Sequence, residues 1–389
     1  MKITVLRRIP SLPCETLESP QDNRGGCFVE GERLWNAFRW TATVGPWEER
    51  PGHYGDVWNY WSDDGLGYFE FLQLAEDLGA APVWVINNGF SHQDSVDTAN
   101  IASWDALDSI EFARGSADST WGSVRALMGH PEPFTLEYMA IGNEDCGKNN
   151  YTANYFYYAI KNAYPDMNII TNCDASGTTL DHPADFYDFH AFVSEYAVWQ
   201  SDAGKGTLLA SLAEAAFLIG LEKNSDIVGM ASHAPLLVND NIGRRWNPDV
   251  IAFNSSYVYG TPSYWMQRYF RESSGAILNP ATVQSDLSSL AASAITYKSS
   301  DNSSYLKIKV VNFGSDTVNL QISVSGLASS MNALDSFTTV LTSDDLMDEN
   351  SFSNPTKVVP VQTALTDANT QMDVVIQPHS FTSFDLALA

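Results

Sequence analysis

Two short segments decide how this chain is to be read: the sequence AIGNED at residues 140–145 and the sequence FVSEY at residues 192–196. Each places a glutamate, Glu144 or Glu195, at the end of a short apolar run with strand character. Barrels of alternating strands and helices keep their reactive side chains at the carboxyl ends of the strands. Two carboxyl groups in such positions are the minimum set for cleaving a glycosidic bond. The two segments therefore predict hydrolytic chemistry on a barrel.

The chain around these segments alternates predicted helices and strands from about residue 60. The pattern predicts helices over 66–78, 106–113, 151–163 and 208–221, and strands over 82–86, 136–141, 167–171, 187–190, 192–195 and 227–232. Repeated strand–helix units favour a parallel sheet with helices outside it. Their number favours an α/β barrel of the (β/α)8 type over a doubly wound sheet. No glycine-rich phosphate loop follows any strand, which argues against a dinucleotide fold.

The character of the sequence changes after about residue 275. Helical patterning fades, and short strand-like runs are predicted at 305–311, 318–324, 374–376 and 381–386. We expect an antiparallel β-sandwich there. The predicted organisation is an atypical N-terminal segment at 1–24, a catalytic barrel at 25–274 and a sandwich at 275–389. The sandwich is expected to pack against the barrel, and a polymer-binding role for it stays open.

Composition excludes several classes of partner. The net charge of −26 repels phosphate backbones, so we expect no nucleic acid. The aromatic content of 12% suits a neutral, polyhydroxylated ligand, although an acidic surface also serves solubility alone. The longest apolar stretch, around 208–221, is interrupted by Ser211 and Glu214 and is too short for a bilayer, so no membrane partner is expected. The four cysteines lack metal-binding spacing, so no structural zinc is expected.

The residue types at the two segments suit acid–base and nucleophilic roles. Asn143 beside Glu144 is placed to hold a substrate hydroxyl while the carboxyl protonates the leaving oxygen. Glu195 as a nucleophile must stay ionised, and His190 and Tyr196 are suitable hydrogen-bonding neighbours. The alternatives are a capping glutamate at position 144 and an exposed strand-end glutamate at position 195. Two strand-end glutamates in one chain favour the catalytic interpretation.

Seven motifs resemble the α-L-arabinofuranosidases of glycoside hydrolase family 51, most closely the plant and fungal branch. They are GGCFVEG at 25–31, GPWEERP at 45–51, DDGLGYFEF at 63–71, AIGNED at 140–145, FVSEYA at 192–197, GLEKNSD at 220–226 and RWNPD at 245–249. The resemblance runs from about Gly25 to the C-terminus. It implies a (β/α)8 barrel with a β-sandwich, retaining hydrolysis, no cofactor or metal, and release of terminal arabinofuranose from arabinan and arabinoxylan.

The resemblance also assigns roles to individual residues. By motif, Glu144 matches the acid/base, Glu195 the nucleophile, Asn143 a ligand of the sugar hydroxyls, and His190 the histidine that ends the sixth strand. Tyr196 adjoins the nucleophile. The turn that includes Cys27, and the segment that includes Trp47 and Glu48, resemble parts that line the same pocket.

The chain departs from the family pattern in two places. Residues 1–23 do not resemble the region that precedes the Gly25-Gly26 turn in relatives. Only five positions separate His190 from Glu195, where relatives have a helix and a loop. Neighbouring parallel strands need a crossover of about a dozen residues. We therefore expect either one fused strand, with His190 and Glu195 on opposite faces, or an incomplete barrel that lacks one strand–helix unit.

Three functions stay open at this stage. The first is a retaining enzyme that acts on arabinose-containing polysaccharide. The others are a catalytically impaired relative that only binds such glycans and a barrel glycosidase of other specificity. The family resemblance implies an extracellular, secreted glycoprotein, although no signal peptide is visible, and three N-glycosylation sequons begin at Asn150, Asn254 and Asn302. The oligomeric state is not predicted.

Overall fold

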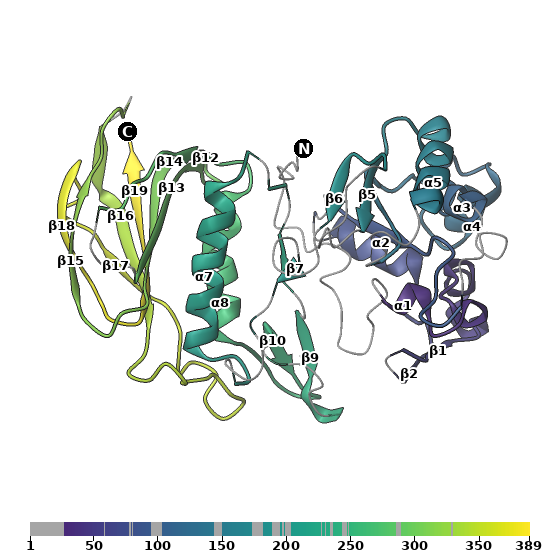
Figure 1. The fold of residues 1–389 in the computed structure, drawn as a ribbon, viewed down its shortest axis with the longest axis horizontal. Helices are drawn as coiled ribbons and strands as arrows, with labels where there is room; N and C mark the ends of the chain where they lie inside the picture. Colours follow the sequence, from purple (N-terminus) through teal and green to yellow (C-terminus); the bar gives the residue numbers. More distant parts are fainter. Residues whose placement is uncertain are drawn as a thin grey trace. The chain divides into compact units, whose positions relative to one another are not determined.

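In the computed structural model, four short parallel strands form the sheet of the N-terminal half (Figure 1). In sheet order they are β3 (Val83–Ile86), β4 (Tyr138–Ile141), β5 (Asn168–Asn172) and β6 (Phe186–Asp188). All four residues of β3 and all four of β4 are buried. Strands covered on both faces are continuous apolar runs, which is how VWVI and YMAI read in the sequence.

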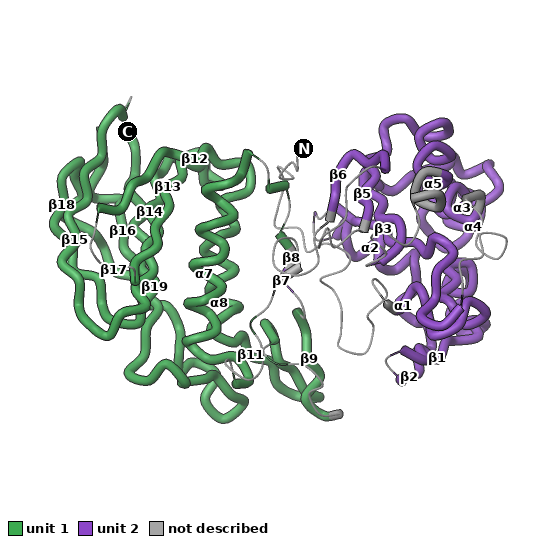
Figure 2. Tube along the Cα trace, viewed as in Figure 1, with its two compact units in different colours: residues 1–7, 197–231, 235–389 green, residues 8–196, 232–234 purple. Residues whose placement is uncertain are grey.

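The structure describes residues 27–389, except for 58, 78, 80, 95–102, 144–149, 173–181, 189–194, 197, 199–203, 227, 230, 234–235, 243–246, 248, 285–288 and 328–329. The chain divides into two units (Figure 2). One comprises residues 8–196 and 232–234, and the other residues 1–7, 197–231 and 235–389. The predicted boundaries at residues 24 and 274 stay predictions.

Four helices accompany the parallel sheet in the first unit: α2 (Tyr68–Asp77), α3 (Ser103–Arg114), α4 (Thr120–Leu127) and α5 (Asn150–Ala163). Helix α3 packs against both α4 and α5. Aromatic rings join helix to sheet, since Tyr68 of α2 stacks on Trp84 of β3 with ring centroids 3.9 Å apart. Helix α2 is followed by Gly79, whose φ of 65° is the left-handed conformation that commonly ends helices.

A small hairpin and a set of short turns precede α2. The hairpin pairs β1 (His53–Gly55) with β2 (Tyr60–Ser62) in antiparallel register. Before it come α1 (Cys27–Glu30) and the 3₁₀ turns η2 (Leu34–Asn36), η3 (Trp40–Thr43) and η4 (Trp47–Glu49).

The strand that carries Glu195 belongs to a different sheet from β6. Strand β7 (Glu195–Tyr196) pairs in parallel with β8 (Ser232–His233), whereas β6 pairs with β5. The strand pairs seen in the described part of the chain do not include β6 with β7. Six residues, 189–194, separate the two strands, and such a link is too short for the crossover that parallel neighbours need. The described parallel pairs thus lie in three separate sheets, one with β3 to β6, one with β7 and β8, and one that pairs β9 (Leu237–Asn239) with β10 (Ile251–Phe253), and not in one closed ring.

The second unit is built on antiparallel strands. Its large sheet has the order β12 (Ile277–Asn279), β13 (Leu290–Lys298), β14 (Ser304–Asn312), β19 (Ser380–Leu388), β16 (Met331–Thr342) and β17 (Val361–Ala364). A second sheet pairs β15 (Val318–Ser323) with β18 (Gln371–Ile376). The apolar core that includes Leu306, Ile322, Ile376 and Phe384 draws side chains from both sheets, as in a sandwich.

Helices and a small third sheet complete this unit. Helix α7 (Leu208–Lys223) packs against β13 and β14 and also against α8 (Pro262–Phe270), which continues into η6 (Arg271–Ser273). The third sheet has the order β11 (Val258–Gly260), β10 (Ile251–Phe253) and β9 (Leu237–Asn239), and η5 (Asp240–Ile242) follows β9. Within the described ranges, no helix combines the length and the apolar character that a membrane span requires.

Most predicted elements are confirmed. The four predicted helices are α2, α3, α5 and α7, and confirmed predicted strands include β3, β4, β5, β14, β15, β18 and β19. The strand predicted over 227–232 is wrong in extent, because residues 228, 229 and 231 lie outside any strand and β8 begins at Ser232. That apolar run contains Gly229, and glycine weakens a strand interior.

Candidate active site

The carboxyl ends of the four parallel strands lie level with one another. Ile86 of β3 is aligned with Ile141 of β4, Ile141 with Thr171 of β5, and Thr171 with Tyr187 of β6. The residues that follow these positions therefore meet at one edge of the sheet. In barrels and open parallel sheets alike, this edge carries the reactive groups.

Asn143 lies at this edge, two residues beyond β4. Gly142 has a φ of 79°, which turns the chain away from the strand direction, and its N–H donates to the carbonyl of Ile86 over 2.9 Å. Such a positive φ favours glycine, because a Cβ is strained there. Asn143 is only 5% exposed. Its predicted partner, Glu144, lies outside the described residues.

The second predicted carboxylate begins strand β7. The backbone of Glu195 is paired in parallel with Ser232, and that of Tyr196 with His233. The side chains of Glu195 and Tyr196 are not among those the structure describes, and His190 lies outside the described residues. The predicted separation of the two glutamates therefore stays a prediction.

Asn87 fastens helix α1 to the same edge. It directly follows β3, and its amide nitrogen donates to the carbonyls of Val29 in α1, over 2.7 Å, and of Phe90, over 2.8 Å. Its amide oxygen accepts the N–H groups of Gly89 and Phe90. Asn87, whose side chain makes these four hydrogen bonds, is only 5% exposed. Cys27 is the first residue of α1, so Asn87 fixes the backbone segment that carries it.

Charged contacts reinforce this junction between α1 and the loop after β3. His92 Nε2 lies 3.2 Å from Glu30 Oε2, and Arg33 Nη1 donates to Asp94 Oδ1 over 2.8 Å. The hydrogen bond from Arg33 holds the pKa of Asp94 below its ordinary value, and the backbone N–H of Leu34 adds to this effect. The turn that the family resemblance assigns to the pocket is thus bound to the edge of the sheet by side chains of both segments.

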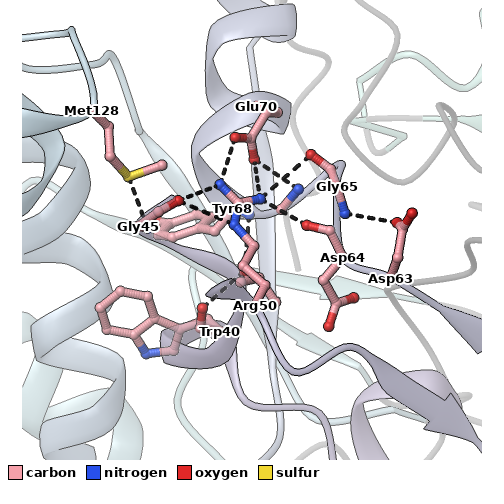
Figure 3. Close-up of polar contacts among 11 residues, drawn as sticks. Trp40, Gly45, Arg50, Asp63, Asp64, Gly65, Tyr68, Glu70 and Met128 are labelled. Carbon is pink, nitrogen blue, oxygen red and sulfur yellow. Dashed lines mark hydrogen bonds and ion pairs between the residues drawn. The ribbon is translucent and has the colours of Figure 1, made fainter. Parts of the chain in front are cut away.

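Trp47 and Glu48, also predicted to line the pocket, lie in η4 with exposed side chains, Trp47 being 67% exposed. Arg50, which follows η4, is the centre of a polar cluster (Figure 3). Its guanidinium donates to the carbonyls of Gly45 and Asp64 and to both carboxylate oxygens of Glu70. Gly45 precedes the hairpin and Asp64 follows it, so Arg50 joins the two ends of the β1–β2 hairpin.

A small, partly open cavity of about 20 Å³ lies between β3 and α3, with Trp84, Asn87 and Asp105 among its lining residues. This volume holds about one water molecule, so the cavity is no sugar site. Burial raises the pKa of Asp105, whose carboxylate accepts a hydrogen bond from the indole of Trp40. In the ranges the structure describes, no group of three or more His, Cys, Asp or Glu side chains is arranged to hold a metal ion.

The sequence patterns do not predict the structural roles of three residues: Asn87 at this edge, and Arg50 and Glu70 at the base of the hairpin. Each lies in or beside a motif or strand end named above. The usable signal for Asn87 was its position directly after a buried strand. Arg50 and Glu70 each lie within a family motif, but nothing local marks them as partners.

Comparison with known proteins gives the chain its relatives. Residues 21–203 match the model of the α-L-arabinofuranosidase 1 domain, and residues 194–380 match that of the α-L-arabinofuranosidase C-terminal domain. The chain is 62% identical to α-L-arabinofuranosidase 1 and 58% identical to α-L-arabinofuranosidase 2 of Arabidopsis thaliana. Each alignment covers 93% of this chain but 57% of the relative, so the chain spans little more than half the length of these proteins.

Solved structures give the same assignment. An arabinose-bound structure of the MgGH51 α-L-arabinofuranosidase superposes with a TM-score of 0.83 at 28% identity, covering 94% of this chain and 64% of that one. The α-L-arabinofuranosidase of Thermotoga maritima, in an arabinose complex, superposes with a TM-score of 0.73 over 94% of this chain and 86% of its own, and at 20% identity it shows the fold alone. The predicted fold class, an incomplete (β/α)8-type barrel followed by a β-sandwich, is confirmed. Because two consecutive family models together span residues 21–380, the chain belongs to the α-L-arabinofuranosidases of glycoside hydrolase family 51.

Proposed function

We propose that this chain is a retaining glycosidase that releases terminal α-L-arabinofuranose from arabinan- and arabinoxylan-type polysaccharides. The observation that carries the proposal is the position of Asn143. It is buried at the level carboxyl edge of the parallel sheet, and Glu144 is the next residue in the chain. This is where a barrel glycosidase carries its acid/base.

The proposed reaction has two steps. Glu195 attacks the anomeric carbon while Glu144 protonates the departing glycosidic oxygen, which gives a covalent arabinosyl–enzyme. Glu144, now ionised, then removes a proton from water, which attacks the anomeric carbon and releases the sugar with its original configuration. This route requires the two carboxyl groups to lie about 5–5.5 Å apart.

The remaining predicted residues bind and orient the sugar in this proposal. Asn143 holds a ring hydroxyl, and His190 and Tyr196 hydrogen-bond near the nucleophile. Cys27, Trp47 and Glu48 line the pocket. Asn87 supports the site indirectly, because it fixes the backbone of α1.

The test is the initial rate on an aryl α-L-arabinofuranoside for the wild type, Glu144→Gln and Glu195→Gln, with Glu137→Gln as the matched control. Glu137 is an exposed carboxylate just before β4. We expect each active-site variant to lose at least about 10³-fold in kcat, while the control keeps its rate. Proton NMR of the first product should show the retained anomer. A substitution at either site that leaves the rate intact, or an inverted product, contradicts the assignment.

A binding protein without turnover is the second candidate. Only six residues link β6 to β7, and these strands lie in separate sheets. Folded wild-type protein that binds arabinan but does not hydrolyse the aryl glycoside would favour this candidate. Release of oligosaccharides from a polymer would instead favour a barrel glycosidase of other specificity.

We also propose an extracellular, glycosylated protein with a role in L-arabinose metabolism. Asn302 is the most accessible sequon asparagine among the described ones, since it lies in the exposed turn between β13 and β14. Expression through a eukaryotic secretory pathway should add a glycan that Asn302→Gln reduces, as read by the mass before and after glycosidase treatment. An unmodified secreted product would exclude glycosylation at this position.

A further inference from the structure

The outward face of the β1–β2 hairpin carries two aromatic side chains. Tyr54 of β1 and Trp61 of β2 are direct cross-strand partners, so their side chains project from the same face. Tyr54 is 45% exposed and Trp61 is 62% exposed. Figure 1 shows the hairpin at the edge of its unit.

The opposite face of the hairpin is covered by α1. Phe28 of α1 packs against His53 with ring centroids 5.1 Å apart and against Tyr60 at 6.0 Å. A Cβ on Gly55 would lie 2.9 Å from the Phe28 ring, so the strand approaches this ring closely. The hairpin therefore buries one face on α1 and leaves the Tyr54–Trp61 face to solvent.

The two rings stand on a backbone fixed at several points. Gly52 has a φ of 69°, and a Cβ there would lie 2.5 Å from the six-membered ring of Trp61, so this indole rests against the glycine. Asp56 accepts the N–H of Glu32 over 2.9 Å, and Asn36 donates to the carbonyl of Tyr54 over 2.9 Å. A surface whose backbone is already ordered binds at a lower entropic cost.

We propose that the Tyr54–Trp61 face is a stacking surface for the glycan chain that extends beyond the arabinose being released. This inference rests on the proposed function and names its substrate class: polymeric or oligomeric substrate, as opposed to a single terminal sugar on a small leaving group. The faces of sugar rings carry C–H groups that pack on aromatic rings, and the polar rim of Tyr and Trp reaches their hydroxyls.

The chemistry of the surroundings favours a neutral glycan. The Tyr54 hydroxyl donates to the Asn59 amide oxygen over 3.3 Å, so an amide borders the rings. The size of the face argues against a protein partner. Two aromatic side chains of about 200 Å² each, half exposed, offer about 200 Å², whereas a stable protein interface buries about 800 Å² on each partner.

The position of the face supports the same occupant. Its supporting ring, Phe28, follows Cys27 directly in α1, and α1 is bound to the end of β3 through Val29 and Asn87. The stacking surface and the segment that carries Cys27 thus share one structural support, helix α1.

The test compares Tyr54→Ala, Trp61→Ala and Trp61→Phe with Tyr158→Ala as the matched control. Tyr158 is 57% exposed on α5. We expect kcat/KM on linear arabino-oligosaccharides and arabinan to fall about tenfold in Trp61→Ala, less in Tyr54→Ala, and to recover in part in Trp61→Phe. The rate on an aryl α-L-arabinofuranoside should stay within about twofold in all variants. Equal losses on both substrates, no loss on the polymer, or the same loss in Tyr158→Ala would overturn the proposal.

Affinity electrophoresis separates this proposal from the proposed function. Wild-type protein should be retarded in gels that contain arabinan, and Trp61→Ala should not, even if the chain hydrolyses nothing. Retardation without hydrolysis would refute the enzyme but keep the stacking surface. Size-exclusion chromatography identifies the competing occupant, because a wild-type dimer that Trp61→Ala converts to a monomer would make this face a contact between copies and overturn the proposal.

Discussion

Arg50 and Glu70 form a bidentate ion pair, with Nη1 to Oε2 at 2.9 Å and Nη2 to Oε1 at 2.7 Å. Glu70 Oε2 also accepts the N–H of Gly67, the residue before α2, as the third helical residue does in a capping box. A Cβ on Gly67 would lie 2.0 Å from the carbonyl of Thr43, so this position requires glycine. The motifs at 45–51 and 63–71 therefore belong together because they build one cluster, which starts α2 and closes the base of the hairpin.

Replacing Arg50 with lysine should destabilise the N-terminal unit by about 2 kcal/mol, because an ammonium cannot reproduce the fork of the guanidinium. Arg50→Ala should cost about 3–5 kcal/mol, since it removes the cationic partner of the Glu70 carboxylate, whose side chain is 26% exposed. The Arg50 side chain is 2% exposed. Urea unfolding followed by tryptophan fluorescence measures both losses.

The exposed pair of Arg33 and Asp94 supplies the control for this measurement. The Arg33 side chain is 48% exposed, so Arg33→Ala should change the unfolding midpoint far less than Arg50→Ala. Equal shifts in the two variants would mean that burial does not strengthen the ion pair between Arg50 and Glu70.

Asn87→Asp tests the junction between α1 and the sheet with a nearly isosteric change. The substitution replaces an NH₂ group that donates to the carbonyls of Val29 and Phe90 with a carboxylate oxygen that repels them. We expect a loss of about 2–4 kcal/mol in the free energy of unfolding. We also expect a fall in kcat on an aryl arabinofuranoside larger than the unfolded fraction explains, because α1 loses its position.

Thermal melting and the initial rate, measured on the same samples, separate these two effects. Asn224→Asp is the control, since the Asn224 side chain makes one exposed hydrogen bond, to the carbonyl of Gly220. Asn87→Asp protein that melts and turns over like the wild type would show that α1 does not depend on this side chain.

Much of the fold follows from local sequence patterns. The apolar runs VWVI and YMAI predict strands buried on both faces, and the strand ends predict where Asn143 lies. Gly142, the glycine of the motif AIGNED, has the positive φ at which the chain leaves the strand direction. These features depend on neighbouring residues only, so a single sequence contains them.

The unpredicted features depend on contacts between distant residues. Arg50 and Glu70 are 20 positions apart, and each looks like an ordinary surface charge in the sequence. Strand β16 escaped prediction because its buried and exposed residues do not alternate regularly, and its register shifts between Asn332 and Phe337. The sequence motifs predict the roles of Glu144 and Glu195. The distance between their carboxyl groups stays a prediction.

The second unit, which contains the β-sandwich, has a buried ion pair. Single and double substitutions of this pair should change the free energy of unfolding by different amounts. Lys309 and Glu222 pair with side chains 0% and 7% exposed, and Lys309 Nζ also lies 4.0 Å from the centre of the Phe270 ring. Glu222→Gln should cost about 3–5 kcal/mol, because the buried ammonium loses its counter-charge. The double variant Lys309→Met with Glu222→Leu should recover most of this loss, since an apolar pair of similar volume replaces the ions.

Thermal and urea unfolding of the wild type, Lys309→Met, Glu222→Leu and the double variant form the cycle that measures this coupling. The Ser293 hydroxyl donates to Glu222 over 2.5 Å and loses that acceptor in the double variant, which sets a limit to the recovery. A double variant as unstable as the sum of the two single variants would contradict the argument.

Glu272 should make the sandwich unit sensitive to acid. Burial raises the pKa of its carboxyl, but the Lys307 ammonium 3.1 Å away outweighs this effect, so that the pKa lies below its ordinary value. A carboxyl whose pKa is lower in the folded than in the unfolded state contributes stability above the unfolded pKa of about 4.5 and loses it as the pH falls through the folded pKa. The melting temperature of the wild type should therefore exceed that of Glu272→Gln at pH 6–7, and the two values should converge as the pH drops below about 4.

Differential scanning calorimetry between pH 3 and 7 measures this difference, and Arg271→Gln is the control. Arg271 also approaches Glu272, at 3.4 Å, but its side chain is 54% exposed, so its removal should change stability by less than about 1 kcal/mol. Lys307 keeps a second partner, Asp385 at 3.3 Å, which limits the loss in Glu272→Gln to about 1–2 kcal/mol at neutral pH. If the melting temperatures of the wild type and Glu272→Gln changed in parallel over the whole pH range, a carboxyl other than Glu272 would have to cause the acid sensitivity.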